Sequence, residues 1–111
     1  MENKTTEFSF VLNVSKINGV GVFATHAISK GTKLNLFWER GRSLKIVPKA
    51  FLKYCIEDGK QYACATNFGR MSVGWYLNHS KTPNAFHKNY LYFANRNIKV
   101  GEEILIDYDT L

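Results

Sequence analysis

Alternating apolar and polar positions along the chain predict several short strands and very little helix. Residues 8–14 combine this alternation with β-branched and aromatic side chains, which is typical of a strand. Residues 19–24, Gly-Val-Gly-Val-Phe-Ala, predict a turn that enters a second strand, and the two glycines permit either a positive φ or a close approach of another group to the backbone. Residues 85–94 predict a hairpin with its turn near Lys88 and Asn89. The pattern therefore indicates a mostly-β domain.

The C-terminal residues predict one further strand. A Gly-Glu-Glu turn at residues 101–103 is followed by an alternation that places Ile104, Ile106 and Tyr108 on one face. Tyr108 is expected to end this strand in a buried position.

Residues 48–57 are the one candidate helix, because Pro48 suits a first helical turn and an apolar stripe follows it. Asp58-Gly59 would end this helix. Residues 61–66 then predict a short strand.

Size and composition indicate one packed domain over residues 1–111, with 45% hydrophobic and 14% aromatic residues. No apolar run approaches the roughly 20 residues that cross a bilayer, and the first residues lack the pattern of a secretory signal. Cys55 and Cys64 are too few for a disulfide framework or a complete zinc site. The expectation is a soluble protein of a reducing compartment, without a membrane segment or a metal.

The net charge of +6 is concentrated in the first half of the chain. Residues 1–50 carry eight Lys/Arg and three Asp/Glu, giving +5, whereas residues 51–111 carry seven and six, giving +1. Such a basic half favours an acidic partner or nucleic acid, or it is simply a solvated surface that keeps the protein soluble.

Three ordered motifs carry a resemblance to a known family. Residues 78–84 read Asn-His-Ser-Lys-Thr-Pro-Asn, and residues 101–108 read Gly-Glu-Glu-Ile-Leu-Ile-Asp-Tyr. The approach to the second motif, residues 92–101, contains an aromatic pair and an Arg-x-Ile-x-x-Gly run, and residues 18–24 contain the Gly-Val-Gly turn. Over about residues 12–109 the chain resembles the SET-domain protein-lysine methyltransferases.

The resemblance implies a fold and an activity. The expected fold is the β-clip-like SET domain, made of short sheets with a C-terminal pseudoknot and a small, partly helical variable insert at about residues 39–72. The expected activity is methylation of a protein lysine by S-adenosylmethionine, with S-adenosylhomocysteine as the product. The substrate would be a histone or another basic protein.

The resemblance also assigns residues to the cofactor and to the chemistry. The main chain of Asn18 and Val20 would face the methionine end of the cofactor, and Asn78 and His79 would contact it from the Asn-His motif. Tyr108 matches the family's catalytic tyrosine, whose hydroxyl lies at the site of transfer.

Four further residues are candidates for the channel that receives the lysine: Phe37, Tyr76, His87 and Ile106. Phe37 stands where the family usually has a tyrosine, and Ile106 where it has a phenylalanine or tyrosine that limits the number of methyl groups added. With no hydroxyl at either position, we expect transfer beyond monomethylation. His87 has the alternative of being an exposed hairpin residue.

Two alternatives and several expectations about partners remain open. The chain ends three residues after Tyr108, without the cysteine-rich zinc-binding segment of many relatives, so the insert, a second subunit in a homodimer or the substrate would cover the site. The alternatives are a catalytically weak SET-like module that binds a protein, and a basic β-domain that binds nucleic acid. Nucleic acid is not expected beyond non-specific charge attraction. The expected location is cytoplasmic, or nuclear if the substrate is a histone.

Overall fold

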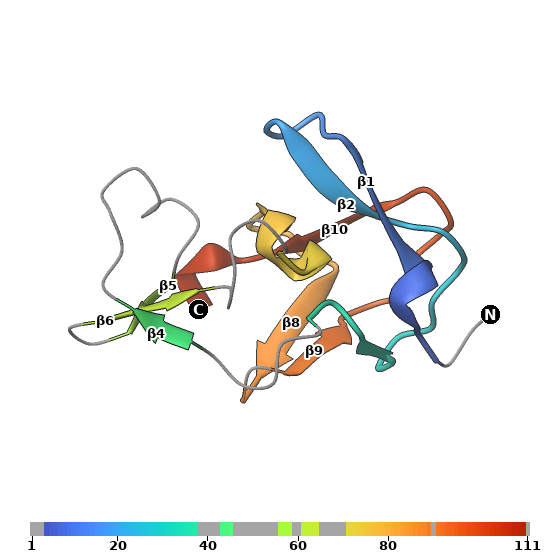
Figure 1. Ribbon diagram of the computed structural model, residues 1–111. Helices are drawn as coiled ribbons and strands as arrows, with labels where there is room; N and C mark the ends of the chain where they lie inside the picture. The colour runs from blue at the N-terminus through green and yellow to red at the C-terminus, as the bar shows by residue number, and fades with distance from the viewer. Residues whose placement is uncertain are drawn as a thin grey trace.

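The computed structural model describes residues 4–37, 71–89 and 91–110, and the backbone of three strands between residues 43 and 64 (Figure 1). The elements are ten short strands and three described 3₁₀ turns, so the mostly-β prediction is confirmed for the described residues. In chain order they are η1 (Glu7–Ser9), β1 (Phe10–Val14), β2 (Val20–Ala24), β3 (Lys33–Leu34), β4 (Ser43–Lys45), β5 (Ile56–Asp58), β6 (Gln61–Cys64), η3 (Val73–Tyr76), β7 (Asn78–His79), β8 (Ala85–Lys88), β9 (Leu91–Ala94), β10 (Glu103–Ile106) and η4 (Tyr108–Thr110).

The first sheet has the order β1-β2-β10-β7 and places the C-terminal strand between distant segments. On one side β10 pairs antiparallel with β2, with Ile104 opposite Val22. On the other side it pairs in parallel with β7, with Leu105 opposite Asn78. The Asn-His motif thus lies beside the last strand, which is the placement expected of the pseudoknot of a SET fold.

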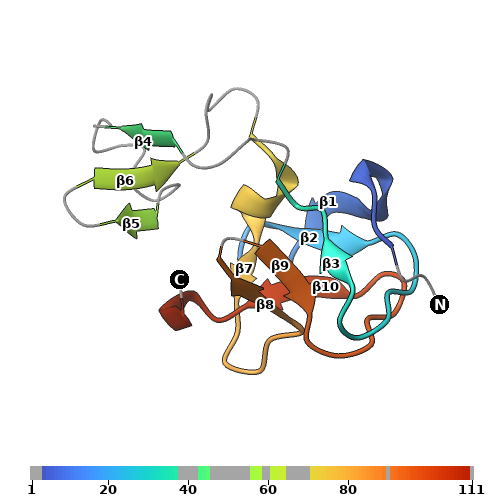
Figure 2. The ribbon, with the colours of Figure 1, turned by 90° about the horizontal axis from the view of Figure 1, so that it is seen from below.

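The second sheet has the order β3-β9-β8, and its β8–β9 hairpin confirms the hairpin predicted for residues 85–94. Asn89 in the turn has a φ of 52°, a left-handed conformation that asparagine adopts more readily than most residues. Figure 2 shows β8 close to β10, so the two sheets lie next to each other.

The third sheet, β4-β6-β5, corrects part of the predicted helix. Ile56 and Glu57, expected at the end of a helix over residues 48–57, lie in β5, where Ile56 pairs with Ala63 of β6. Pairing with β6 provides the backbone N–H and C=O groups with the hydrogen bonds that a helix would have formed within its own segment. The rest of the predicted helix lies outside the described residues, and the strand predicted for residues 61–66 is confirmed at residues 61–64.

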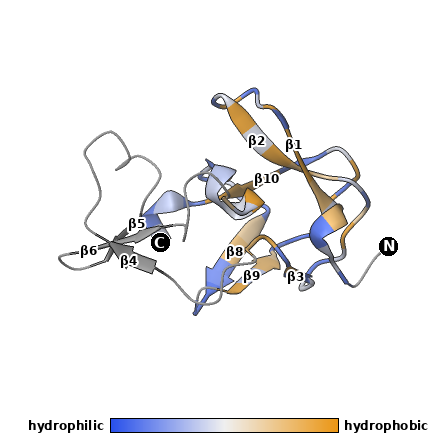
Figure 3. Cartoon of the chain, viewed as in Figure 1, coloured by the Kyte–Doolittle hydropathy of each residue, from blue (hydrophilic) through white to orange (hydrophobic). Residues whose placement is uncertain are grey.

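The core lies between the first two sheets. Val22, Ile28, Ile98 and Ile104 are at most 1% exposed, and Ile28 and Ile98 exchange two backbone hydrogen bonds of 2.8 Å each. β1, β2 and β9 are coloured hydrophobic over most of their lengths (Figure 3). Among the described residues, no helix is long and apolar enough to span a bilayer.

Tyr108 does not end the last strand, contrary to the sequence-based expectation. The predicted alternation of the strand is confirmed at Ile104 and Ile106, which are 0% and 3% exposed, but the strand ends at Ile106. The Asp107 side chain accepts the N–H of Asp109 at 3.0 Å and the Asp107 carbonyl accepts the N–H of Thr110 at 3.1 Å. These local bonds favour a turn over a strand. Tyr108 therefore begins η4 and is 46% exposed.

Candidate functional site

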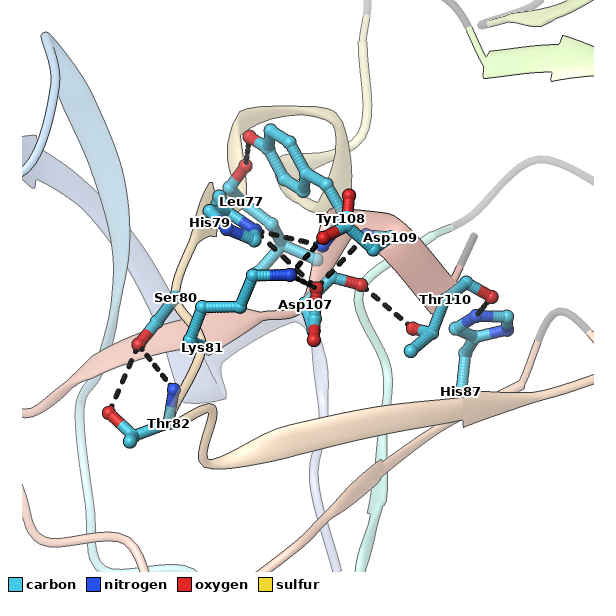
Figure 4. A network of polar contacts seen from close by, with 10 residues as sticks. All are labelled: Leu77, His79, Ser80, Lys81, Thr82, His87, Asp107, Tyr108, Asp109 and Thr110. Carbon is cyan, nitrogen blue, oxygen red and sulfur yellow. Dashed lines mark hydrogen bonds and ion pairs between the residues drawn. The ribbon is translucent and has the colours of Figure 1, made fainter.

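Tyr108 is bound to the residues on both sides of Asn78. Its backbone N–H donates to Nδ1 of His79 at 3.0 Å, and its hydroxyl donates to the carbonyl oxygen of Leu77 (Figure 4). The rings of Tyr108 and His79 lie 5.2 Å apart between centroids. The two signature motifs of the sequence therefore meet here, because β10 carries the second motif alongside β7, which begins the first.

Asn78 joins the Asn-His motif to the N-terminal hairpin. Its side chain is buried, at 6% exposed, and Nδ2 donates to the carbonyl oxygens of Asn18 and Val20, each at 3.1 Å. A third acceptor, Oε2 of Glu103, lies 2.9 Å from the same nitrogen. Three acceptor oxygens around one end of the amide identify that end as the nitrogen. Three residues predicted to contact a cofactor, Asn18, Val20 and Asn78, thus converge.

Gly21 permits this convergence because it has no side chain. A Cβ at this position would overlap the Glu103 carboxylate and lie 3.1 Å from Nδ2 of Asn78. Gly19 serves differently, since its φ is +48° and no atom lies within 4 Å of the position a Cβ would take. Both possibilities that the sequence left open for the two glycines are thus realised, one at each glycine.

Glu103 is part of this site, although the sequence indicated only a pair of turn carboxylates. The Ser15 hydroxyl lies 2.8 Å and 2.9 Å from its two carboxylate oxygens. Ser15 also accepts the N–H of Ile17 at 2.9 Å, which ties Glu103 to the turn of the hairpin. The contact spans 88 residues of sequence, and no local pattern predicts a pairing of that kind.

Asn84, the last residue of the first motif, holds β10 in place. It is 1% exposed; its Nδ2 donates to the carbonyl of Glu103 at 2.7 Å, and its Oδ1 accepts the N–H of Leu105 at 2.8 Å. The Asn84 amide donates to one backbone carbonyl of β10 and accepts from one backbone N–H. It therefore makes the kind of hydrogen bonds that a neighbouring strand would make. Asn84 is therefore a structural residue of the motif.

The aromatic candidates gather around η3. The Phe37 ring lies 5.3 Å from the rings of both Trp75 and Tyr92, measured between centroids. A Cβ on Gly74 would overlap the Phe37 ring, so Gly74 allows this ring to lie against the η3 backbone. Phe37 and Tyr76 are partly buried and pack against the core.

His87 and Ile106 occupy different surroundings. His87 lies 2.6 Å from the carbonyl oxygen of Thr110 through Nε2, and its ring is 5.8 Å from that of Tyr92. Ile106 is 3% exposed and belongs to the hydrophobic core. The structure therefore places His87 against η4 and Ile106 in the core, and their assignment to a lysine channel stays a prediction.

Burial, followed by the negative charge of Glu103, raises the pKa of Tyr108 above its ordinary value of 10.0. The phenol is therefore protonated at neutral pH and acts as a hydrogen-bond donor. It is not suited to act as a general base at that pH.

One group of side chains in the described part of the chain has the spacing of metal ligands: His79, Asp107 and Asp109. The Lys81 ammonium lies 3.5 Å from Asp107 and also pairs with Asp109 (Figure 4). The hydrogen bond from Lys81 and the positive charge of Lys81 lower the pKa of the Asp109 carboxyl. With Lys81 against both carboxylates and His79 accepting from Tyr108, the group already has internal partners, and the absence of a metal stays a prediction.

Comparisons with known proteins agree with this architecture. A family model of the SET domain matches residues 19–109. A crystal structure of a Plasmodium falciparum protein proposed to be a histone methyltransferase matches with a TM-score of 0.66. It is 24% identical, and the match covers 90% of this chain and 92% of that one. No curated protein sequence matches.

Proposed function

The chain belongs to the SET-domain family, and we propose that it transfers a methyl group from S-adenosylmethionine to a lysine side chain of a protein. Two sets of hydrogen bonds carry this proposal. Tyr108 bonds to the residues on both sides of Asn78, and the Asn78 side chain donates to the carbonyls of Asn18 and Val20. Groups expected to contact the cofactor and the group expected at the transfer site thus lie together.

One acceptor atom of Asn78 has no donor among the described residues, and this supports the fit of the cofactor. Among the described residues none donates a hydrogen bond to Oδ1 of Asn78, although the side chain is 6% exposed. A buried acceptor without a donor is unusual in folded proteins. The α-ammonium of S-adenosylmethionine is a donor of the required kind, and Asn18, Val20 and His79 are the neighbours that would hold the rest. When bound, the cofactor supplies a sulfonium-activated methyl group.

The protein's part in the reaction is to position the lysine and keep its amine neutral. A free lysine has a pKa of about 10.4, so its amine is mostly protonated at neutral pH. Aromatic surroundings disfavour the ammonium and lower this pKa. Phe37, Tyr76 and Tyr92 are candidates for those surroundings, and the protonated Tyr108 hydroxyl would orient the reacting groups through hydrogen bonding.

We further propose a basic protein, such as a histone, as the substrate. The support is the fold shared with the Plasmodium falciparum protein, together with the family's reaction. The insert at residues 39–72, a second subunit in a homodimer or the substrate itself would cover the site, and all three are proposals.

The test is transfer of a labelled methyl group to a mixture of basic proteins that includes histones. Tyr108→Phe should lower the rate on the order of 100-fold, as removal of one oriented hydrogen-bonding group in an active site typically does. Thr25→Val is the matched control, since its hydroxyl also donates to a backbone carbonyl, that of Phe8 at 2.7 Å. Binding of S-adenosylmethionine without transfer to any protein would favour the weak binding module instead.

A further inference from the structure

Glu103 lies at the junction of three segments that meet only in the folded chain. Its carboxylate is partly buried, lies 2.8 Å and 2.9 Å from the Ser15 hydroxyl through its two oxygens, and accepts from Nδ2 of Asn78 at 2.9 Å. Gly21 leaves the room for it, because a Cβ there would overlap the carboxylate.

A carboxylate suits this position because it accepts hydrogen bonds and donates none when ionised. The Asn78 amide can turn by 180° unless its surroundings distinguish nitrogen from oxygen. The Glu103 oxygen strengthens that distinction, since hydrogen bonds to a charged acceptor are roughly twice as strong as neutral ones. Glu103 therefore keeps the nitrogen of the amide towards the hairpin and its oxygen away from it.

The same carboxylate holds the turn of the hairpin. The Ser15 hydroxyl donates to Glu103 and accepts the N–H of Ile17 at 2.9 Å. The turn that follows presents the Asn18 carbonyl to Nδ2 of Asn78. The orientation of the Asn78 amide and the position of the hairpin turn thus both depend on the Glu103 side chain.

We propose that Glu103 is a positioning residue for the cofactor: it orients the Asn78 amide and the hairpin turn so that Oδ1 of Asn78 faces the cofactor's ammonium. This inference rests on the proposed function, because it assigns Glu103 a role at that same site. Glu103 acts through Asn78 and is not itself a catalytic residue.

The neighbouring Glu102 has other partners and provides a matched control. It accepts from Arg96 at 2.6 Å, from the N–H of Lys99 at 3.0 Å and from Asn84 at 3.0 Å. These contacts secure the turn before β10 and do not include Asn78. Substitution of Glu102 should therefore affect stability and not the cofactor.

Glu103 also has an electrostatic effect that can be measured without the cofactor. After burial, its charge is the second cause of the raised pKa of Tyr108. Glu103→Gln removes the charge and keeps the shape, so the Tyr108 phenol should titrate at lower pH in the variant. An unchanged titration would mean that the Glu103 charge does not act on Tyr108; the orientation of Asn78 is tested by cofactor binding.

The experiment compares Glu103→Ala, Glu103→Gln and Glu102→Ala by calorimetric titration with S-adenosylhomocysteine, with the folded fraction checked by circular dichroism. Loss of a hydrogen bond to a charged group corresponds to about 10- to 100-fold in affinity. We expect Glu103→Ala to weaken binding by that factor, Glu103→Gln to recover part of it through its remaining oxygen, and Glu102→Ala to change it less than about threefold. The Tyr108 phenol, followed by NMR of ring-labelled tyrosine and assigned with Tyr108→Phe, should titrate lower in Glu103→Gln.

The outcomes separate the two proposals. Wild-type affinity in both Glu103 variants, or equal weakening by Glu102→Ala and Glu103→Ala, would overturn the positioning role and leave the proposed function standing. No binding by the folded wild type would overturn both.

Discussion

Nδ1 of His79 accepts the backbone N–H of Tyr108 over 3.0 Å. This bond requires that Nδ1 carry no proton, so the hydrogen of a neutral ring lies on Nε2. Because the Tyr108 hydroxyl also reaches the Leu77 carbonyl, Tyr108 is fixed at both its backbone and its side chain. The phenol is thereby oriented before any ligand binds, which is the form of preorganisation that lowers the cost of binding and catalysis.

His79→Phe should release the Tyr108 backbone while keeping an aromatic ring at that position. A single hydrogen bond contributes about 0.5–1.5 kcal/mol, so the amide hydrogen of Tyr108 should exchange several-fold faster with solvent. NMR hydrogen exchange measures this change. Lys81→Ala is the control, because the Lys81 side chain is 65% exposed and its ion pairs with Asp107 and Asp109 are screened by solvent. Unchanged exchange in His79→Phe would show that η4 is held by other contacts.

Gly21→Ala should weaken cofactor binding at least about tenfold, whereas Gly19→Asn should not. The added Cβ at Gly21 displaces the Glu103 carboxylate and presses on Asn78. At Gly19 the φ of +48° is one that asparagine adopts, and the surroundings leave room for a side chain. Calorimetry with S-adenosylhomocysteine compares the two variants, and equal affinities would contradict the close approach at Gly21.

The sequence was sufficient for the overall fold because its signals are local or shared with a family. Alternation predicted the strand faces of Ile104 and Ile106, and a turn residue of suitable conformation marked the hairpin at Asn89. The strand predicted over residues 8–14 begins at Phe10, because the Thr6 side chain caps a short 3₁₀ turn before it. Local side-chain bonds likewise ended the last strand before Tyr108.

Contacts between distant segments could not be predicted in the same way. The sequence motifs indicate Asn18, Val20 and Asn78 one by one, but the hydrogen bonds that join them depend on β10 lying between β2 and β7. The sequence indicates only a turn residue at Glu103, because its partners Ser15 and Asn78 lie 88 and 25 positions away. Its only sequence signal is that it follows the turn glycine of a family motif.

If the proposed methyl transfer to lysine takes place, more than one methyl group should be added. Phe37, which packs against the aromatic rings of Trp75 and Tyr92, carries no hydroxyl that would hold a water beside the amine. Phe37→Tyr should therefore shift the products towards monomethyl-lysine, as read by mass spectrometry. Phe86→Tyr, a similar change on a ring that is 43% exposed, is the control. A wild-type reaction that stops at monomethyl-lysine would contradict this expectation.

Glu102 should stabilise the fold above about pH 4.5 and lose this effect in acid. Burial alone would raise its pKa, but hydrogen bonds from the Lys99 N–H, Asn84 and Arg96 outweigh burial and hold the pKa below its ordinary value of 4.5. A carboxylate with a lower pKa in the folded state contributes stability above its unfolded pKa and loses it as pH falls through the folded value.

The stability difference between wild type and Glu102→Gln should therefore be largest at neutral pH and shrink below pH 4.5. Urea unfolding at a series of pH values measures it, with the exposed Glu7→Gln as the control. A difference that stays constant across this range would mean that Glu102 acts through shape alone.

Calorimetric titration with S-adenosylhomocysteine, comparing wild type with Asn78→Ala, tests the central claim most directly. Asn95→Ala is the control, because its amide makes one exposed contact, to the Pro83 carbonyl at 3.3 Å. We predict that wild type and Asn95→Ala bind with similar affinity and that Asn78→Ala binds at least about tenfold more weakly while remaining folded by circular dichroism. Equal binding by all three would place the cofactor elsewhere, and no binding by a folded wild type would contradict a cofactor site at Asn78.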